Sequence, residues 1–191
     1  MARPGPRKPP RPSASLAKAV APAGATAGCA ADRTATPAKS VSSANDTAAR
    51  AAQRTAERVR DGMFANDRAS KALGMTIVEV APGRALLSMT VRDDMLNGHD
   101  LCHGGLIATL ADSAFAFACN SYDELTVASG FSIDILAPGR LGDVLSARCV
   151  EVSKSGRTGV YDTEVTNQRG ERVAMFRGRS YTIKGKPAVG G

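Results

Sequence analysis

Apolar and polar residues are grouped into a few well-separated stretches of the chain. Residues 75–91 (MTIVEVAPGRALLSMTV) predict two strands around a Pro-Gly turn. Residues 104–120 are Ala-rich and contain no Gly or Pro after the first two positions, which predicts a long helix. A third strand region is expected over residues 125–139. Residues 144–183 alternate apolar and polar positions and are interrupted by the turn sequences KSGR and NQRGE, which predicts a meander of antiparallel strands.

The helix predicted over residues 104–120 is apolar on nearly all sides, so it needs cover on every side. A single curved antiparallel sheet of five to six strands would cover most of it, and a second subunit could cover the rest. The order of hairpin, helix and strands therefore predicts an α+β fold with one central helix wrapped by an antiparallel sheet.

The first third of the chain has a different composition. Residues 1–55 contain no aromatic residue and almost no large aliphatic one, so they cannot bury enough apolar surface to offset the entropy of ordering. We expect a disordered tail over residues 1–62 with a helical end, a folded domain over residues 63–185 and a flexible C-terminus over residues 186–191. An export signal ending at Cys29 and a start codon placed too far upstream are alternative explanations of the tail.

The basic charge belongs to the tail. Residues 1–62 hold 11 Lys and Arg against 4 Asp and Glu, whereas the rest of the chain holds 14 of each. A neutral folded part argues against nucleic-acid binding, which normally needs a basic face on the fold itself. No apolar run is long enough to span a membrane. The four cysteines form no Cys-x-x-Cys pair, so free thiols in a reducing, cytoplasmic compartment are expected.

The segment NGHDLCHGG before the helix and Asp112 within it carry the candidate chemistry. The segment is rich in turn-forming residues and would present backbone N–H groups at a helix N-terminus, where negative charge is favoured. Such donors could hold a carbonyl oxygen that becomes an oxyanion, with Gly104 as the candidate donor. Asp112 could act as a nucleophile or as a general base. Together they suit acyl transfer to water.

The spacing between these two groups adds a constraint. Gly104 and Asp112 are eight residues apart, which corresponds to about 12 Å along a helix, so one carbonyl carbon cannot lie within bonding reach of both. Two antiparallel helices at a two-fold interface would place Asp112 of one chain opposite Gly104 of the other. We therefore expect a homodimer at minimum, and more specifically a homotetramer.

Five segments of the chain, in the same order along the sequence, resemble those of one enzyme family, the PaaI-like (phenylacetyl-CoA type) hotdog-fold acyl-CoA thioesterases. The matching segments are MFANDRASKALG (63–74), MLNGHDLCHGG (95–105), LADSAFAFACN (110–120), SKSGRTGVYDTEV (153–165) and FRGRSY (176–181). The resemblance implies a hotdog fold, dimers paired into tetramers, and hydrolysis of phenylacetyl- or hydroxyphenylacetyl-CoA in phenylacetate catabolism without any cofactor or metal.

The resemblance also assigns roles to residues. Asp112 matches the family's catalytic carboxylate, Gly104 its oxyanion-forming N–H, and Asn97 and His103 the polar residues that frame the thioester. Four further residues are predicted to contact the substrate: Asn66, Gly105, Ser129 and Arg157. In some relatives a Ser that places the water occupies the position of Ala128; here that position is Ala, and Ser129 stands beside it. Arg157 could meet the phosphates of CoA.

Simpler interpretations stay open for each candidate. Asp112 could be a structural carboxylate satisfied by local hydrogen bonds, His103 could cap or orient the turn, and Asn97 could be an ordinary turn residue. The HxxCH pattern of residues 99–103 does not fit zinc, because adjacent Cys and His cannot easily converge on one ion. For the whole protein, the alternatives are a non-catalytic hotdog module that binds acyl-CoA and a hotdog dehydratase.

Overall fold

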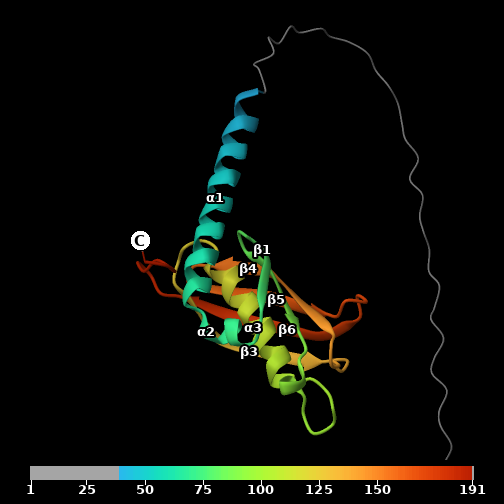
Figure 1. Ribbon diagram of the computed structural model, residues 1–191. Helices are drawn as coiled ribbons and strands as arrows, with labels where there is room; N and C mark the ends of the chain where they lie inside the picture. Colours follow the sequence, from blue (N-terminus) through green and yellow to red (C-terminus); the bar gives the residue numbers. More distant parts are fainter. Residues whose placement is uncertain (1–38, 191) are drawn as a thin grey trace, which may run out of the picture. The chain divides into compact units, whose positions relative to one another are not determined.

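The computed structural model describes residues 39–190 and is drawn in Figure 1. The helices and strands, in chain order, are α1 (Lys39–Asn66), α2 (Arg68–Ala72), β1 (Thr76–Ala81), β2 (Arg84–Thr90), the short 3-10 helix η1 (Asp93–Met95), α3 (Gly104–Asn120), β3 (Thr126–Ile135), β4 (Val144–Ser155), β5 (Thr158–Thr166) and β6 (Arg172–Thr182). None of the helices in this part of the chain is long and apolar enough to cross a membrane.

The strands form one six-stranded sheet in the order β1-β2-β4-β5-β6-β3, and every neighbouring pair is antiparallel. The sheet curves around α3, which contacts all six strands (Figure 1). Alternate residues of β2, β4 and β5 are buried on the face toward α3, as expected for strands with a period of two. The α+β hotdog fold predicted from the sequence is confirmed.

Large side chains from the helix and the sheet fill the core between them. Phe115 of α3 packs against Tyr161 of β5 and Phe176 of β6, with ring centroids 5.4 and 5.9 Å apart. The Phe115 ring fits because β6 has Gly178 opposite it; a Cβ at Gly178 would lie 2.9 Å from the ring. This packing fixes α3 against the sheet one turn after Asp112.

One stripe of α3 is left half-exposed by the sheet. Gly105, Ala108, Thr109, Asp112 and Ala116 follow one another at helical spacing and are not fully buried, whereas most of the remaining α3 residues are. The open stripe therefore contains the candidate carboxylate, and the helix buries its other faces in the core of a single chain.

The N-terminal helix crosses the expected domain boundary. α1 continues without a break past residues 62 and 63, and Ala56 and Val59, which come before that point, are buried. The expected tail before Lys39, including Cys29, lies outside the described residues. α1 packs beside β1 and α3 (Figure 1).

Candidate active site

The turn before α3 is held together by its own side chains. The Oδ1 of Asn97 accepts hydrogen bonds from the N–H groups of His99 and Leu101 over 2.9 and 3.3 Å. Asp100, within this turn, has a φ of 57°, the left-handed region that Asp tolerates better than most residues. The Asn97 side chain therefore shapes the backbone that leads to α3.

His103 caps the N-terminus of α3. Its Nδ1 accepts a hydrogen bond from the Gly105 N–H over 3.2 Å, and its own backbone N–H donates to the Met95 carbonyl over 2.9 Å. The Gly105 N–H therefore already donates a hydrogen bond within the chain. The N–H of Gly104 has no acceptor among the described residues, so it is the free donor at the positive end of a 17-residue helix.

Gly104 opens into a pocket of about 360 Å³. The lining residues are Asn97, Leu101, Cys102, Gly104, Ile107, Ile135, Leu136, Ala137 and Pro138. Two of the predicted site residues, Asn97 and Gly104, therefore meet here. A carbonyl oxygen placed against the Gly104 N–H would have a mostly apolar wall around it, which strengthens a hydrogen bond to a developing oxyanion.

Asp112 opens into a different pocket, of about 290 Å³. Its lining residues are Met63, Asp112, Phe115, Ala116, Cys119, Asn120, Leu125, Thr126, Val127, Ala128 and Ala188. The Asn120 amide is engaged with backbone groups of Ala116 and Thr126, so the pocket is mainly apolar. Asp112 and Gly104 thus do not share a pocket within one chain, as expected from their spacing.

The carboxylate of Asp112 has no hydrogen-bond or ion-pair partner among the described residues. Burial raises the pKa of its carboxyl group, because desolvation penalises the charged form. An unpaired, half-buried carboxylate in an apolar pocket destabilises the fold, and such groups are typical of sites with a chemical role. The structural interpretation, a carboxylate satisfied by local hydrogen bonds, gains no support.

This pKa shift leads to a prediction on stability. A carboxyl group whose pKa is raised by folding costs no stability below the ordinary Asp pKa. The cost grows as the pH rises from the ordinary to the raised pKa, and it is constant above the raised pKa. We expect Asp112→Asn to increase the free energy of unfolding at pH 7 by on the order of 1 kcal/mol or less. Urea denaturation at pH 7 and at about pH 4 should show the gain shrinking at the lower pH. An equal gain at both pH values, or one equal to that of the exposed control Asp46→Asn, would contradict the assignment.

The other predicted residues lie elsewhere. Asn66 ends α1 and is exposed, and its Nδ2 donates to the Gly62 carbonyl over 3.4 Å. Ser129 is exposed on β3 at a bulge, and its Oγ donates to the Arg179 carbonyl over 3.0 Å. Arg157 lines a third pocket of about 580 Å³ together with Lys184 and Lys186. The structure therefore brings together only part of the predicted set within one chain.

Most residues that line the Asp112 pocket were not predicted from the sequence, and two of them come from distant parts of the chain. Met63 comes from α1, and Ala188 comes from the segment after β6, whose Val189 packs against Gly62 of α1. Neither residue type signals a binding role. Met63 opens the segment MFANDRASKALG that resembles the family, but that segment suggested Asn66 as the contact, and only the fold places Met63 and Ala188 beside Asp112.

Comparison with known proteins gives the family. A sequence profile described as thioesterase superfamily matches residues 99–174. The acyl-coenzyme A thioesterase PaaI of Escherichia coli K12 is 49% identical over 112 residues, which cover 59% of this chain and 80% of that protein. The chain belongs to the thioesterase superfamily. The expected resemblance to the PaaI-like hotdog thioesterases is thereby confirmed, as is the expectation of a thioester-hydrolysing enzyme.

Solved thioesterase structures agree with this assignment. The E. coli PaaI protein from the phenylacetic acid degradation operon superimposes with a TM-score of 0.69 and 46% identity, covering 70% of this chain and 97% of that one. A Streptococcus mutans protein, smu.793, solved with acetyl CoA bound, gives a TM-score of 0.56 with 30% identity and covers 57% and 88% of the two chains. This thioesterase thus shares its fold with relatives that include one with a bound CoA thioester.

Proposed function

We propose that the protein hydrolyses acyl-CoA thioesters and that phenylacetyl-CoA or hydroxyphenylacetyl-CoA is its substrate. The observation that carries this proposal is the unpaired Asp112 carboxylate in an apolar pocket, on the same helix whose N-terminus has the free Gly104 N–H. Support for the CoA ester comes from the relative named acyl-coenzyme A thioesterase PaaI. Support for the aryl acyl group comes from the structural relative of the phenylacetic acid degradation operon.

The proposed reaction uses these two groups at opposite sides of the thioester carbonyl. Asp112 attacks the carbonyl carbon directly or removes a proton from a water that attacks it, so that a C–O bond forms and the carbonyl oxygen becomes negative. The Gly104 N–H stabilises this oxyanion. The C–S bond then breaks. In the water route the proton that Asp112 took from water passes to the CoA sulfur, so that CoA leaves as a thiol and the acyl group as a carboxylic acid. In the direct-attack route CoA leaves first as a thiolate, water then cleaves the acyl-enzyme to release the carboxylic acid, and a proton from that water goes to the CoA thiolate.

The complete site is proposed to form between two subunits. In one chain the Asp112 and Gly104 pockets are separate, and the open stripe of α3 contains Asp112. The neighbouring β3 is an edge strand, and it and the residue that follows it have exposed apolar side chains: Val127, Phe131 and Ile135 on the strand and Leu136 just after it. An exposed apolar edge strand is a surface that folded proteins normally cover. Two-fold pairing would cover it and bring Asp112 of one subunit opposite Gly104 of the other, and two such dimers would form the predicted tetramer.

The CoA phosphates are proposed to bind at Arg157. Its Nε donates to the Thr182 carbonyl over 3.0 Å, and its guanidinium lies 4.4 Å from the centre of the Tyr181 ring. These contacts fix the side chain, so little entropy is lost when it pairs with a phosphate. Lys184 and Lys186 line the same pocket and add positive charge. Asn66, Gly105 and Ser129 stay proposed substrate contacts, and His103 and Asn97 are proposed to frame the thioester through the turn they hold.

Thiol release from a panel of acyl-CoAs tests the proposal. We expect kcat/KM for phenylacetyl-CoA or its hydroxylated form to exceed the values for acetyl-CoA and palmitoyl-CoA at least about tenfold, because the apolar pocket favours a compact aromatic acyl group. A higher value for a long-chain thioester would overturn the substrate class. Binding of all the thioesters without thiol release would instead identify a non-catalytic acyl-CoA module.

We place the reaction in the cytoplasm, since the described cysteines are free and buried.

A further inference from the structure

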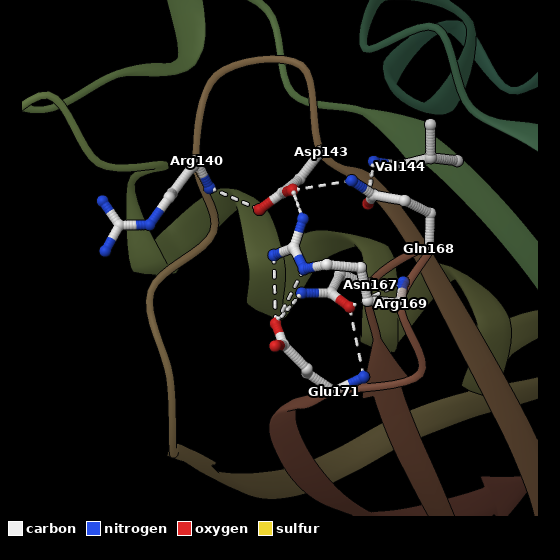
Figure 2. Close-up of polar contacts among 7 residues, drawn as sticks. All are labelled: Arg140, Asp143, Val144, Asn167, Gln168, Arg169 and Glu171. Carbon is white, nitrogen blue, oxygen red and sulfur yellow. Dashed lines mark hydrogen bonds and ion pairs between the residues drawn. The ribbon is translucent and has the colours of Figure 1, made fainter.

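Asp143, a carboxylate outside the proposed chemistry, is almost completely buried beside β4. Its exposed fraction is 3%. Its Oδ2 accepts the Arg140 N–H over 2.9 Å, and its Oδ1 accepts the Gln168 amide over 2.9 Å and the Arg169 guanidinium over 3.0 Å (Figure 2). Burial alone would raise the pKa of this carboxyl group, but these hydrogen bonds and the charge of Arg169 outweigh it and lower the pKa. The carboxylate is therefore ionised, and both of its oxygens accept hydrogen bonds.

The contacts of Asp143 join two loops that are distant in sequence. Arg140 belongs to the loop between β3 and β4, whereas Gln168 and Arg169 belong to the turn between β5 and β6. The turn is itself held by Glu171, whose Oε2 accepts from both Arg169 and Asn167 (Figure 2). Asp143 thus anchors the β3–β4 loop to a rigid turn.

The same loop holds the backbone that precedes Gly104. The carbonyl of Gly139, next to Arg140, accepts the Cys102 N–H over 2.9 Å. The approach is close, because a Cβ at Gly139 would lie 3.1 Å from the Cβ of Cys102. Cys102 is two residues from Gly104, and Pro138 lines the Gly104 pocket. A short path of two hydrogen bonds, Arg140 N–H to Asp143 and Cys102 N–H to Gly139, together with the backbone between them, therefore links the Asp143 carboxylate to the oxyanion donor.

We propose that Asp143 is a positioning residue, which holds the Gly104 N–H in place through Gly139 and Cys102. This inference rests on the proposed thioester hydrolysis. A donor displaced by about 1 Å loses much of its effect on the transition state while substrate binding changes little. Asp143 therefore acts on kcat rather than on KM.

Asp143→Asn provides the direct test. An Asn side chain has one oxygen and one NH₂ group, so whichever way it turns, the NH₂ group faces N–H donors: Arg140 on one side, or Gln168 and Arg169 on the other. We expect kcat to fall about 10- to 100-fold and KM to change less than about threefold, measured well below the melting temperature of the variant. Amide hydrogen exchange at Cys102 should accelerate at least about tenfold, while exchange in the middle of α3 stays unchanged.

A second substitution should restore the contact between positions 143 and 168 and leave the amide oxygen at position 143 facing the Arg140 N–H. In Asp143→Asn/Gln168→Glu, one Glu oxygen can still accept the Val144 N–H that Gln168 accepts over 3.0 Å, and the other can accept from the side-chain amide introduced at position 143. The double variant should recover most of the lost kcat. Gly139→Ala should lower kcat while leaving the contacts of Asp143 intact, because the added methyl group displaces the Cys102 backbone. Glu164→Gln, which removes an exposed ion pair with Arg172 on β5 and β6, is the matched control and should keep kcat.

The outcomes separate the two proposals. Wild-type protein without thiol release would overturn the proposed function whatever Asp143 does. Suppose that the wild type is active and that Asp143→Asn lowers the melting temperature but changes neither kcat nor the amide hydrogen exchange rate at Cys102. Asp143 is then structural, and the positioning role is wrong. A rise in KM with unchanged kcat would equally overturn it, because that pattern indicates lost ground-state binding.

Discussion

Replacement of Asp112 by Asn is expected to lower kcat for acyl-CoA hydrolysis by about 10³-fold or more, which corresponds to about 4 kcal/mol of lost transition-state stabilisation. Asn keeps the shape of the side chain and removes the charge, so it can neither attack the thioester nor accept a proton from water. The half-exposed position on α3 makes no polar contact within the described chain, so no fold-stabilising interaction is lost. Steady-state thiol release under saturating substrate measures the effect.

The matched control is the neighbouring residue. Ser113→Ala removes a hydroxyl that pairs with Ser70 over 3.2 Å and does not line the Asp112 pocket, so it should keep kcat within about threefold. Asp112→Asn should also still bind acyl-CoA, which calorimetry can measure. If Asp112→Asn retained more than a tenth of the wild-type kcat, the catalytic group would have to be sought elsewhere.

Mixing two inactive variants is expected to restore activity. Asp112→Ala removes the carboxylate, and Gly104→Pro removes the N–H that would hold the oxyanion. In the proposed two-fold arrangement each site takes one group from each chain. A mixed dimer then contains one site with both defects and one intact site, so it should recover about half of the wild-type activity per dimer. Thiol release from purified, differently tagged heterodimers measures this recovery.

Two properties of Gly104→Pro make the mixing experiment feasible. Gly104 is the first residue of α3, and proline is well tolerated at the first helical position because its missing N–H has no partner inside the helix. The free Gly104 N–H has no acceptor in the described chain, so its loss breaks no existing hydrogen bond. Light scattering must first confirm that each variant forms dimers or tetramers. Proven heterodimers that stay inactive would mean that Asp112 and the donor act within one chain, and active monomers would exclude the shared site.

The fold was largely predictable because its local signals agree with one another. The absence of Gly and Pro after residue 105 predicted α3, which indeed covers Gly104–Asn120. The Pro-Gly turn predicted the hairpin of β1 and β2, and the regular alternation after residue 144 predicted β4, β5 and β6. The separation of Asp112 from Gly104 was also predictable, since it depends only on the rise of a helix.

The surroundings of the site were not predictable, because they depend on contacts between distant segments. Met63 and Ala188 reach the Asp112 pocket from opposite ends of the domain. Asp143 meets Gln168 and Arg169 across more than twenty residues of sequence, and nothing in its own neighbourhood signals burial. The sequence allowed either a structural role in the turn or a catalytic role for Asn97 and His103. Their observed hydrogen bonds stabilise the turn. Direct contact of either side chain with a thioester stays a prediction.

Under the proposed arrangement, the division of the site into two pockets on each chain makes activity depend on the protein concentration. If a working site needs two chains, then well below the dimer dissociation constant the number of sites grows with the square of the protein concentration, and halving the concentration leaves about a quarter of the sites. Specific activity would then fall on dilution, and a thioester that binds across both chains would slow this loss by favouring the paired state. At low protein concentration most chains would therefore be inactive monomers. Accumulating substrate would shift the equilibrium toward active dimers.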